Sequence, residues 1–141
     1  MRVKRIRNTP ENEKGQSLVE FALVVPLLLL LVIGIAEFGR AWMAKNILTG
    51  AAREAVRIAA VAAPGGGWNG PAAITRGNQI LTSAGIPLTT GGIPTLGVAN
   101  AASAYGDVTA TVSYNFRVLT GLIPGLDNIT LTSRTTMRRE Y

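Results

Sequence analysis

The chain has 141 residues, of which 48% are hydrophobic and 16% are charged, and it contains no His and no Cys. The missing residue types exclude zinc sites of the usual kind, His-based acid–base catalysis, thiol nucleophiles and disulfides. Fourteen Lys and Arg against eight Asp and Glu give a net charge of +6, which by itself suits either nucleic acid or a membrane surface. Five of these cations lie within the first fourteen residues, directly before an apolar run, and this distribution favours the membrane.

An uncharged run of sixteen residues, 21–36, lies between two glutamates. As a helix it spans about 24 Å, and apolar neighbours extend it towards the ~30 Å thickness of a hydrocarbon core. Basic residues before the run predict a cytoplasmic N-terminus and an exported C-terminal part. A cleaved signal peptide is the competing interpretation, but no small-residue cleavage site follows the run, so a retained single-pass anchor is predicted. Residues expected in the membrane include Phe21, Leu27, Leu31 and Ile35.

Glu20 stands at the start of this apolar stretch. An unpaired carboxylate there costs on the order of 2 kcal/mol or more if it is deeply immersed. Two interpretations are open: Glu20 lies at the headgroup level without a partner, or it pairs with a cation. Cleavage after Gly15 would create such a cation, because the new amine of Gln16 would lie one helical turn before Glu20.

The motif KGQSLVEF (14–21), followed by the apolar run, resembles the class III signal of type IV pilins and pseudopilins. The longer strings EFALVVPLL (20–28), GIAEFGR (34–40) and AAREAVR (51–57) are similar to the TadE-like family, the pilin-like proteins of tight-adherence (Flp) pilus systems. The resemblance implies that a prepilin peptidase cuts after Gly15 and that Gln16 becomes the mature N-terminus. It also implies that Glu20, the fifth residue counted from Gln16, is the acid that the family carries at the fifth position of the mature chain.

Past the apolar run, mostly small residues recur at spacings of three and four, which is typical of one helix face. We call this set the alanine stripe. It consists of Ala41, Ala44, Leu48, Ala52, Ala55, Ala59 and Ala62. The favoured interpretation is that the alanine stripe packs on the protein's own sheet, and the alternative is contact with neighbouring subunits. Pro26 removes one helical hydrogen bond and allows a kink, and PGGG at 64–67 is expected to end a helix of roughly 45 residues.

The C-terminal part predicts one short helix and a small sheet. A helix from Pro71 to about Ser83 is indicated by an apolar face of Ile74, Ile80 and Leu81, although Gly77 weakens it. A short strand is expected around 95–99. Two alternating stretches, 108–116 and 129–137, predict strands joined by an antiparallel return.

The predicted fold class is α+β and pilin-like, with a long N-terminal helix packed on a small antiparallel sheet, because so small a sheet needs a cover. The expected division is a cytoplasmic leader (1–15), the transmembrane part of the helix (16–40), its exported half (41–63), and a loop-rich region with the sheet (64–141).

The sequence predicts neither an enzyme nor a nucleic-acid-binding protein, and no cofactor or metal is expected. Acids are sparse in the exported part, and removal of residues 1–15 lowers the net charge from +6 to +3. The cluster of Arg134, Arg138 and Arg139 is too small to indicate a nucleic-acid-binding surface.

Two functions stay open. One is a pilin-like subunit of the bacterial inner membrane, cut by prepilin peptidase and assembled with other pilin-like subunits and the pilus machinery. The other is a single-pass anchoring or assembly factor of a secretion system that does not polymerise.

Overall fold

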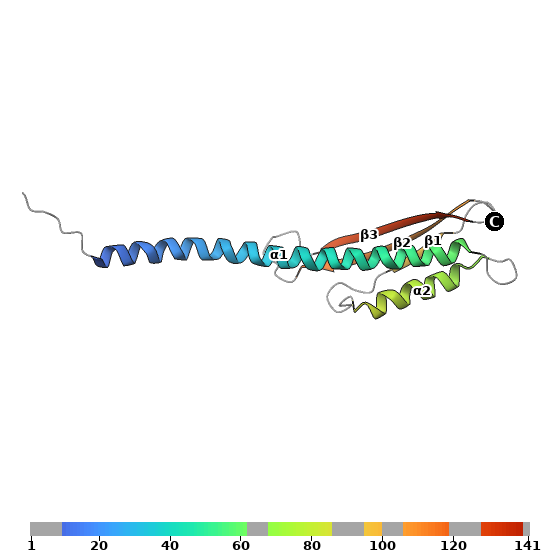
Figure 1. The fold of residues 1–141 in the computed structure, drawn as a ribbon, viewed down its shortest axis with the longest axis horizontal. Coiled ribbons are helices and arrows are strands. Elements are labelled where there is room, and N and C mark those ends of the chain that lie inside the picture. Colours follow the sequence, from blue (N-terminus) through green and yellow to red (C-terminus); the bar gives the residue numbers. More distant parts are fainter. Residues whose placement is uncertain (1–9, 62–67, 86–94, 100–105, 119–127, 140–141) are drawn as a thin grey trace, which may run out of the picture. The chain divides into compact units, whose positions relative to one another are not determined.

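The computed structural model describes residues 10–61, 68–85, 95–99, 106–118 and 128–139. The chain divides into two compact units, Met1–Ala36 and Glu37–Tyr141, and the first helix contributes to both. Figure 1 shows the elements. In chain order they are helices α1 (Pro10–Ala60) and α2 (Gly70–Ser83) and strands β1 (Thr95–Ala99), β2 (Asp107–Arg117) and β3 (Asn128–Arg138).

Helix α1 has 51 residues and is longer than the sequence predicts. It begins at Pro10, which suits a first helical turn because that turn does not need the missing N–H. It continues through Pro26 and ends at Ala60, three residues before the expected boundary at 63. The predicted terminator at 64–67 lies outside the described residues.

The three strands form one antiparallel sheet in the order β1-β2-β3. This confirms both predicted long strands, their antiparallel pairing and the short strand at 95–99. In the centre of the sheet, Val112 of β2 lies opposite Leu96 of β1 and Ser133 of β3, so these three side chains share one face. The same face of β2 is buried along its whole length, at Val108, Ala110, Val112, Tyr114 and Phe116.

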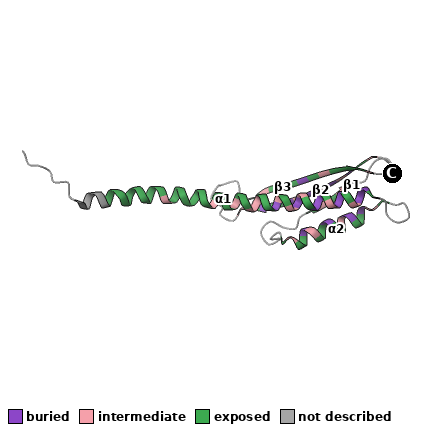
Figure 2. Cartoon of the chain, viewed as in Figure 1, coloured by how far each residue is buried: buried purple, intermediate pink, exposed green. Residues whose placement is uncertain are grey.

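The alanine stripe belongs to the same core as this face of the sheet. Figure 2 shows by colour that the buried residues of α1 lie in the half of the helix nearer its C-terminal end. Most members of the stripe are fully or almost fully buried, namely Ala44, Leu48, Ala52, Ala55 and Ala59. Ala41 is partly buried, and Ala62 lies outside the described residues. Small side chains let the helix approach the sheet closely, so the structure confirms that the described part of the stripe packs within the protein. The buried face is wider than predicted, since Ala51, Val56 and Ala60 also belong to it.

Helix α2 confirms the predicted helix at 71–83, but its buried face differs from the expected one. Gly70, Ala73, Gly77 and Leu81 are buried, whereas Ile74 and Ile80 are only partly buried. The reason is close packing: a Cβ atom at Gly77 would clash with Leu96 of β1 and lie 3.3 Å from the Cβ of Ala55 in α1. The glycine that weakens the helix in isolation is therefore the residue that allows it to pack.

Polar contacts complete the attachment of α1 to its neighbours. The hydroxyls of Thr49 and Ser133 lie 3.0 Å apart, and Lys45 donates a hydrogen bond to the carbonyl of Thr132. On another side of α1, Glu54 accepts hydrogen bonds of 2.9 Å from Arg57 and lies 3.8 Å from Arg76 of α2. The Arg57 guanidinium holds the pKa of the Glu54 carboxyl below its ordinary value, because its hydrogen bonds stabilise the charged carboxylate.

Candidate functional site: the apolar surface of helix α1

The predicted processing residues, Gly15 and Gln16, lie within α1 and are exposed to solvent. No heavy atom other than near neighbours lies within 4 Å of the position that a Cβ would take at Gly15. A glycine inside a helix weakens it by about 1 kcal/mol relative to alanine. The bond after Gly15 is thus accessible and lies at a weak point near the helix N-terminus.

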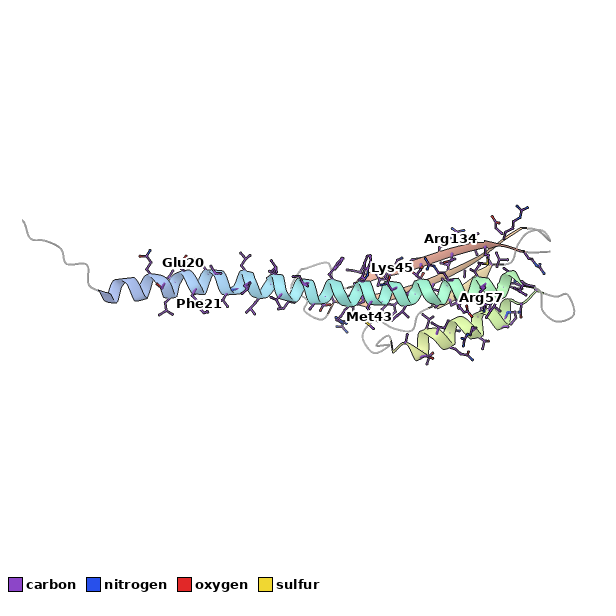
Figure 3. The ribbon with its side chains drawn as sticks, in the orientation of Figure 1. Glu20, Phe21, Met43, Lys45, Arg57 and Arg134 are labelled. Carbon is purple, nitrogen blue, oxygen red and sulfur yellow. The ribbon has the colours of Figure 1, made fainter. Side chains whose placement is uncertain are left out.

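Glu20 is also exposed, and it forms no ion pair with any side chain that the structure describes. It projects from a different side of α1 than Phe21, which follows it (Figure 3). In water such a carboxylate needs no partner, but at membrane depth it is costly unless it is paired or hydrated. The single chain therefore leaves the pairing capacity of Glu20 unused among the described residues.

Most apolar side chains that the structure describes in the first unit are exposed rather than packed. The exposed fractions are 67% for Phe21, 70% for Leu27, 55% for Leu31 and 64% for Ile35. Burial of one such side chain is worth about 1.5–3 kcal/mol, so this surface needs an apolar partner. The segment Gly15–Ala60 is long and apolar enough to include a membrane span, and its most apolar window has no buried residue. It is a candidate single-pass membrane anchor.

A charged cluster stands at the start of the second unit. The guanidinium of Arg40 lies 2.6 Å from the carboxylate of Glu37 and 5.1 Å from the ring centroid of Phe116 in β2. An ion pair three residues apart on a helix is readable from sequence spacing, but the cation–π contact with Phe116 is not. Sequence reasoning missed this cluster, which attaches α1 to the sheet.

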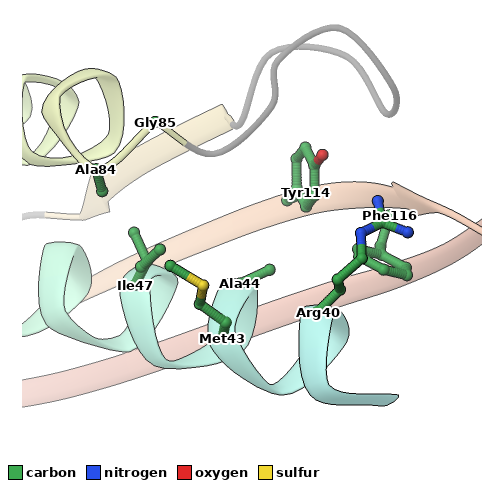
Figure 4. Close-up of a pocket in the computed structure, with 8 residues that line it drawn as sticks. All are labelled: Arg40, Met43, Ala44, Ile47, Ala84, Gly85, Tyr114 and Phe116. Atoms are coloured by element: carbon green, nitrogen blue, oxygen red, sulfur yellow. The ribbon is translucent and has the colours of Figure 1, made fainter. Parts of the chain in front are cut away.

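An apolar cavity of about 220 Å³ adjoins the same cluster (Figure 4). It is lined by Arg40, Met43, Ala44, Ile47, Ala84, Gly85, Tyr114 and Phe116. Its one charged side chain, Arg40, is already paired with Glu37. Within the described part of the chain, no three His, Cys, Asp or Glu residues are close enough to hold a metal ion. The functional feature that the geometry supports best is therefore the exposed surface of α1 rather than the cavity.

Comparison with known proteins identifies a family over part of the chain. The family model described as TadE-like protein matches residues 15–57, which are fewer than a third of the 141 residues. The match begins at Gly15 and ends within the buried half of α1. No curated protein and no solved structure matches the chain significantly. Residues 15–57 are therefore similar to the TadE-like family, which confirms the resemblance found in the sequence motifs.

Proposed function

We propose that the protein is a pilin-like, membrane-anchored subunit that takes part in assembly of a tight-adherence pilus. The observation that supports this most is the combination of a segment similar to the TadE-like family with an apolar helix surface that no described part of the chain covers. The alanine stripe, by contrast, is already used in the protein's own core. The apolar surface available to lipid or to neighbouring subunits then lies on the part of α1 that precedes its buried half.

In this proposal the N-terminus is cytoplasmic, the second unit is exported, and prepilin peptidase cuts between Gly15 and Gln16. The basic residues before the apolar run support the orientation. The exposure of the Gly15–Gln16 bond supports access by a membrane peptidase. Repetition of one helix surface from subunit to subunit generates an open helical assembly, so a subunit can act without catalytic residues.

The processing step is tested by mass spectrometry of the N-terminus in a strain with active prepilin peptidase. The expected peptide begins at Gln16, and the expected protein lacks residues 1–15. Deletion of the peptidase gene should restore the N-terminus at Met1. An intact Met1 in the strain with active peptidase would contradict the processing and leave a non-polymerising anchoring or assembly factor as the better function.

A second test concerns Glu20, for which we propose a pairing role between subunits. In an assembled bundle of helices, the Glu20 carboxylate of one subunit is expected to meet the Gln16 amine of its neighbour, since both leave water. Glu20→Leu should leave membrane insertion intact, because it makes the segment more apolar, but it should remove most incorporation into pili. Glu20→Asp, which keeps the charge, should retain more incorporation than Glu20→Gln.

The measurement is disulfide cross-linking through single introduced cysteines between Leu18 and Leu31, together with adherence. The chain has no cysteine of its own, so every cross-link reports the introduced site. Unchanged cross-links and unchanged adherence in Glu20→Leu would show that Glu20 is an interfacial acid without a partner.

A further inference from the structure

Three large apolar side chains, Phe38, Trp42 and Met43, are exposed on α1 at the start of the second unit. Their exposed fractions are 68%, 61% and 62%. The rings of Phe38 and Trp42 are stacked, with centroids 6.2 Å apart and planes inclined by 27°. We infer that this interfacial patch inserts into the lipid headgroup layer and sets the height at which α1 leaves the membrane. The inference rests on the membrane anchoring proposed above.

The patch continues the apolar surface of the candidate span. Leu31, Ile35, Phe38 and Trp42 follow one another at spacings of four, three and four residues, so they occupy one helix face, and all four are exposed. Beyond Met43, the last residue of the patch, the exposed positions of α1 are polar or lack a side chain, namely Asn46, Gly50, Arg53 and Arg57. The apolar face thus ends on a stacked aromatic pair, as expected where a helix passes from hydrocarbon into water.

The distance along α1 from the apolar run to Trp42 also places the patch in the headgroup layer. If the uncharged run 21–36 is centred in a hydrocarbon core about 30 Å thick, the core ends close to Phe38. The Cα atom of Trp42 then lies about 20 Å from the midplane, in the headgroup layer. Helical side chains lean towards the N-terminus, so the indole ring reaches back towards the membrane. Its N–H can bond to headgroups or water while the ring contacts lipid.

The charged residues next to the patch also fit a position at the membrane surface. If the hydrocarbon core ends close to Phe38, Glu37 lies at its edge, where an unpaired carboxylate is costly. Its carboxylate is paired with Arg40 at 2.6 Å, and Arg40 is supported in turn by the ring of Phe116. A second copy of the chain could also cover the interfacial patch. The apolar face ends at this aromatic pair, however, and does not continue along the rest of α1, and that ending fits a lipid interface better than a helix–helix seam.

The test is depth-dependent quenching of tryptophan fluorescence in the full-length chain, reconstituted in phosphatidylcholine vesicles. The vesicles carry nitroxide lipids in both leaflets, labelled either on the headgroup or near the acyl-chain end. The chain has two tryptophans, Trp42 and Trp68. Trp68→Phe therefore leaves Trp42 as the only reporter, and Trp42→Phe leaves Trp68 as its matched control. Trp68 is a suitable control because it lies away from the patch. It stands just before the N-terminal end of α2, whereas Ala84 and Gly85, at the C-terminal end of α2, line the same cavity as Met43. The length of α2, about 20 Å, thus separates Trp68 from the patch.

The expected result is that the headgroup nitroxide removes most of the Trp42 emission, that the chain-end nitroxide removes little, and that neither affects Trp68. Equal, weak quenching of both tryptophans would place Trp42 in water or against protein, including a second copy, and would overturn the inference. Stronger quenching of Trp42 by the chain-end nitroxide would also overturn it, because the helix would leave the membrane at a different level. Alkaline carbonate extraction separates two failures: a chain that stays in the vesicles without Trp42 quenching contradicts only this inference, whereas a released chain contradicts membrane anchoring as well.

Discussion

Replacement of Gly15 by Leu is expected to leave the whole chain at precursor length in the membrane. A peptidase pocket that accepts glycine will reject a branched side chain at the same position. The structure makes this test specific, because a Cβ at Gly15 would meet no atom within 4 Å and the side chain would point into open space. The substitution also removes a residue that weakens the helix. Immunoblotting of membrane fractions and mass spectrometry of the N-terminus measure the effect.

Gly34→Leu is the matched control for this experiment. Gly34 also lies in α1, and a Cβ there would likewise meet nothing within 4 Å. The control protein should be processed to the Gln16 N-terminus like the unmodified chain. Normal processing of Gly15→Leu, or equal loss of processing in both variants, would refute the assignment of Gly15 to the cleavage site.

Gly77→Val is expected to destabilise the second unit by about 1–3 kcal/mol, the usual cost of overpacking a core. The Cβ position already collides with Leu96, and it lies 3.3 Å from the Cβ of Ala55 and 3.6 Å from the carbonyl oxygen of Ala51. Leu96 can move its side-chain end, but the two contacts on α1 are close to the backbone and cannot move independently of that helix. Thermal unfolding and limited proteolysis of the detergent-solubilised full chain measure the change.

Gly50→Val provides the comparison, because Gly50 is exposed on α1 and a Cβ there would meet nothing within 4 Å. Valine and glycine differ by only a few tenths of a kcal/mol in helix propensity, so this control should be nearly neutral. Gly77→Ala should lie between the two, since the gain in helix propensity offsets part of the contact with Leu96. Equal stability of Gly77→Val and Gly50→Val would show that α2 does not need close approach at Gly77.

Several features of the fold are determined by local sequence. A run of sixteen uncharged residues with apolar neighbours approaches the length that spans a hydrocarbon core, so its composition alone predicts a membrane-anchoring helix. Strict alternation in 108–116 and 129–137 predicts strands with one buried face, and β2 has that pattern. On β3 the same face is mostly half-buried, with Ser133 buried and Met137 exposed. The spacing of the alanine stripe predicts the buried face of α1 for the same reason, because periodicity depends only on the geometry of one element.

Other features depend on which residues the tertiary structure brings together. Ser133 is a polar residue on a buried face, and its partner Thr49 lies 84 positions earlier in the chain. Arg40 is held over Phe116, which no local pattern predicts. Gly77 is unfavourable for a helix by propensity, yet the arrival of Leu96 and Ala55 from two other elements makes a small residue necessary there. The sequence by itself thus determined the elements, the buried faces of α1 and β2, and the motif at the start of α1. Only the tertiary structure decided how closely the elements pack and which polar groups meet, because both depend on contacts between residues far apart in the chain.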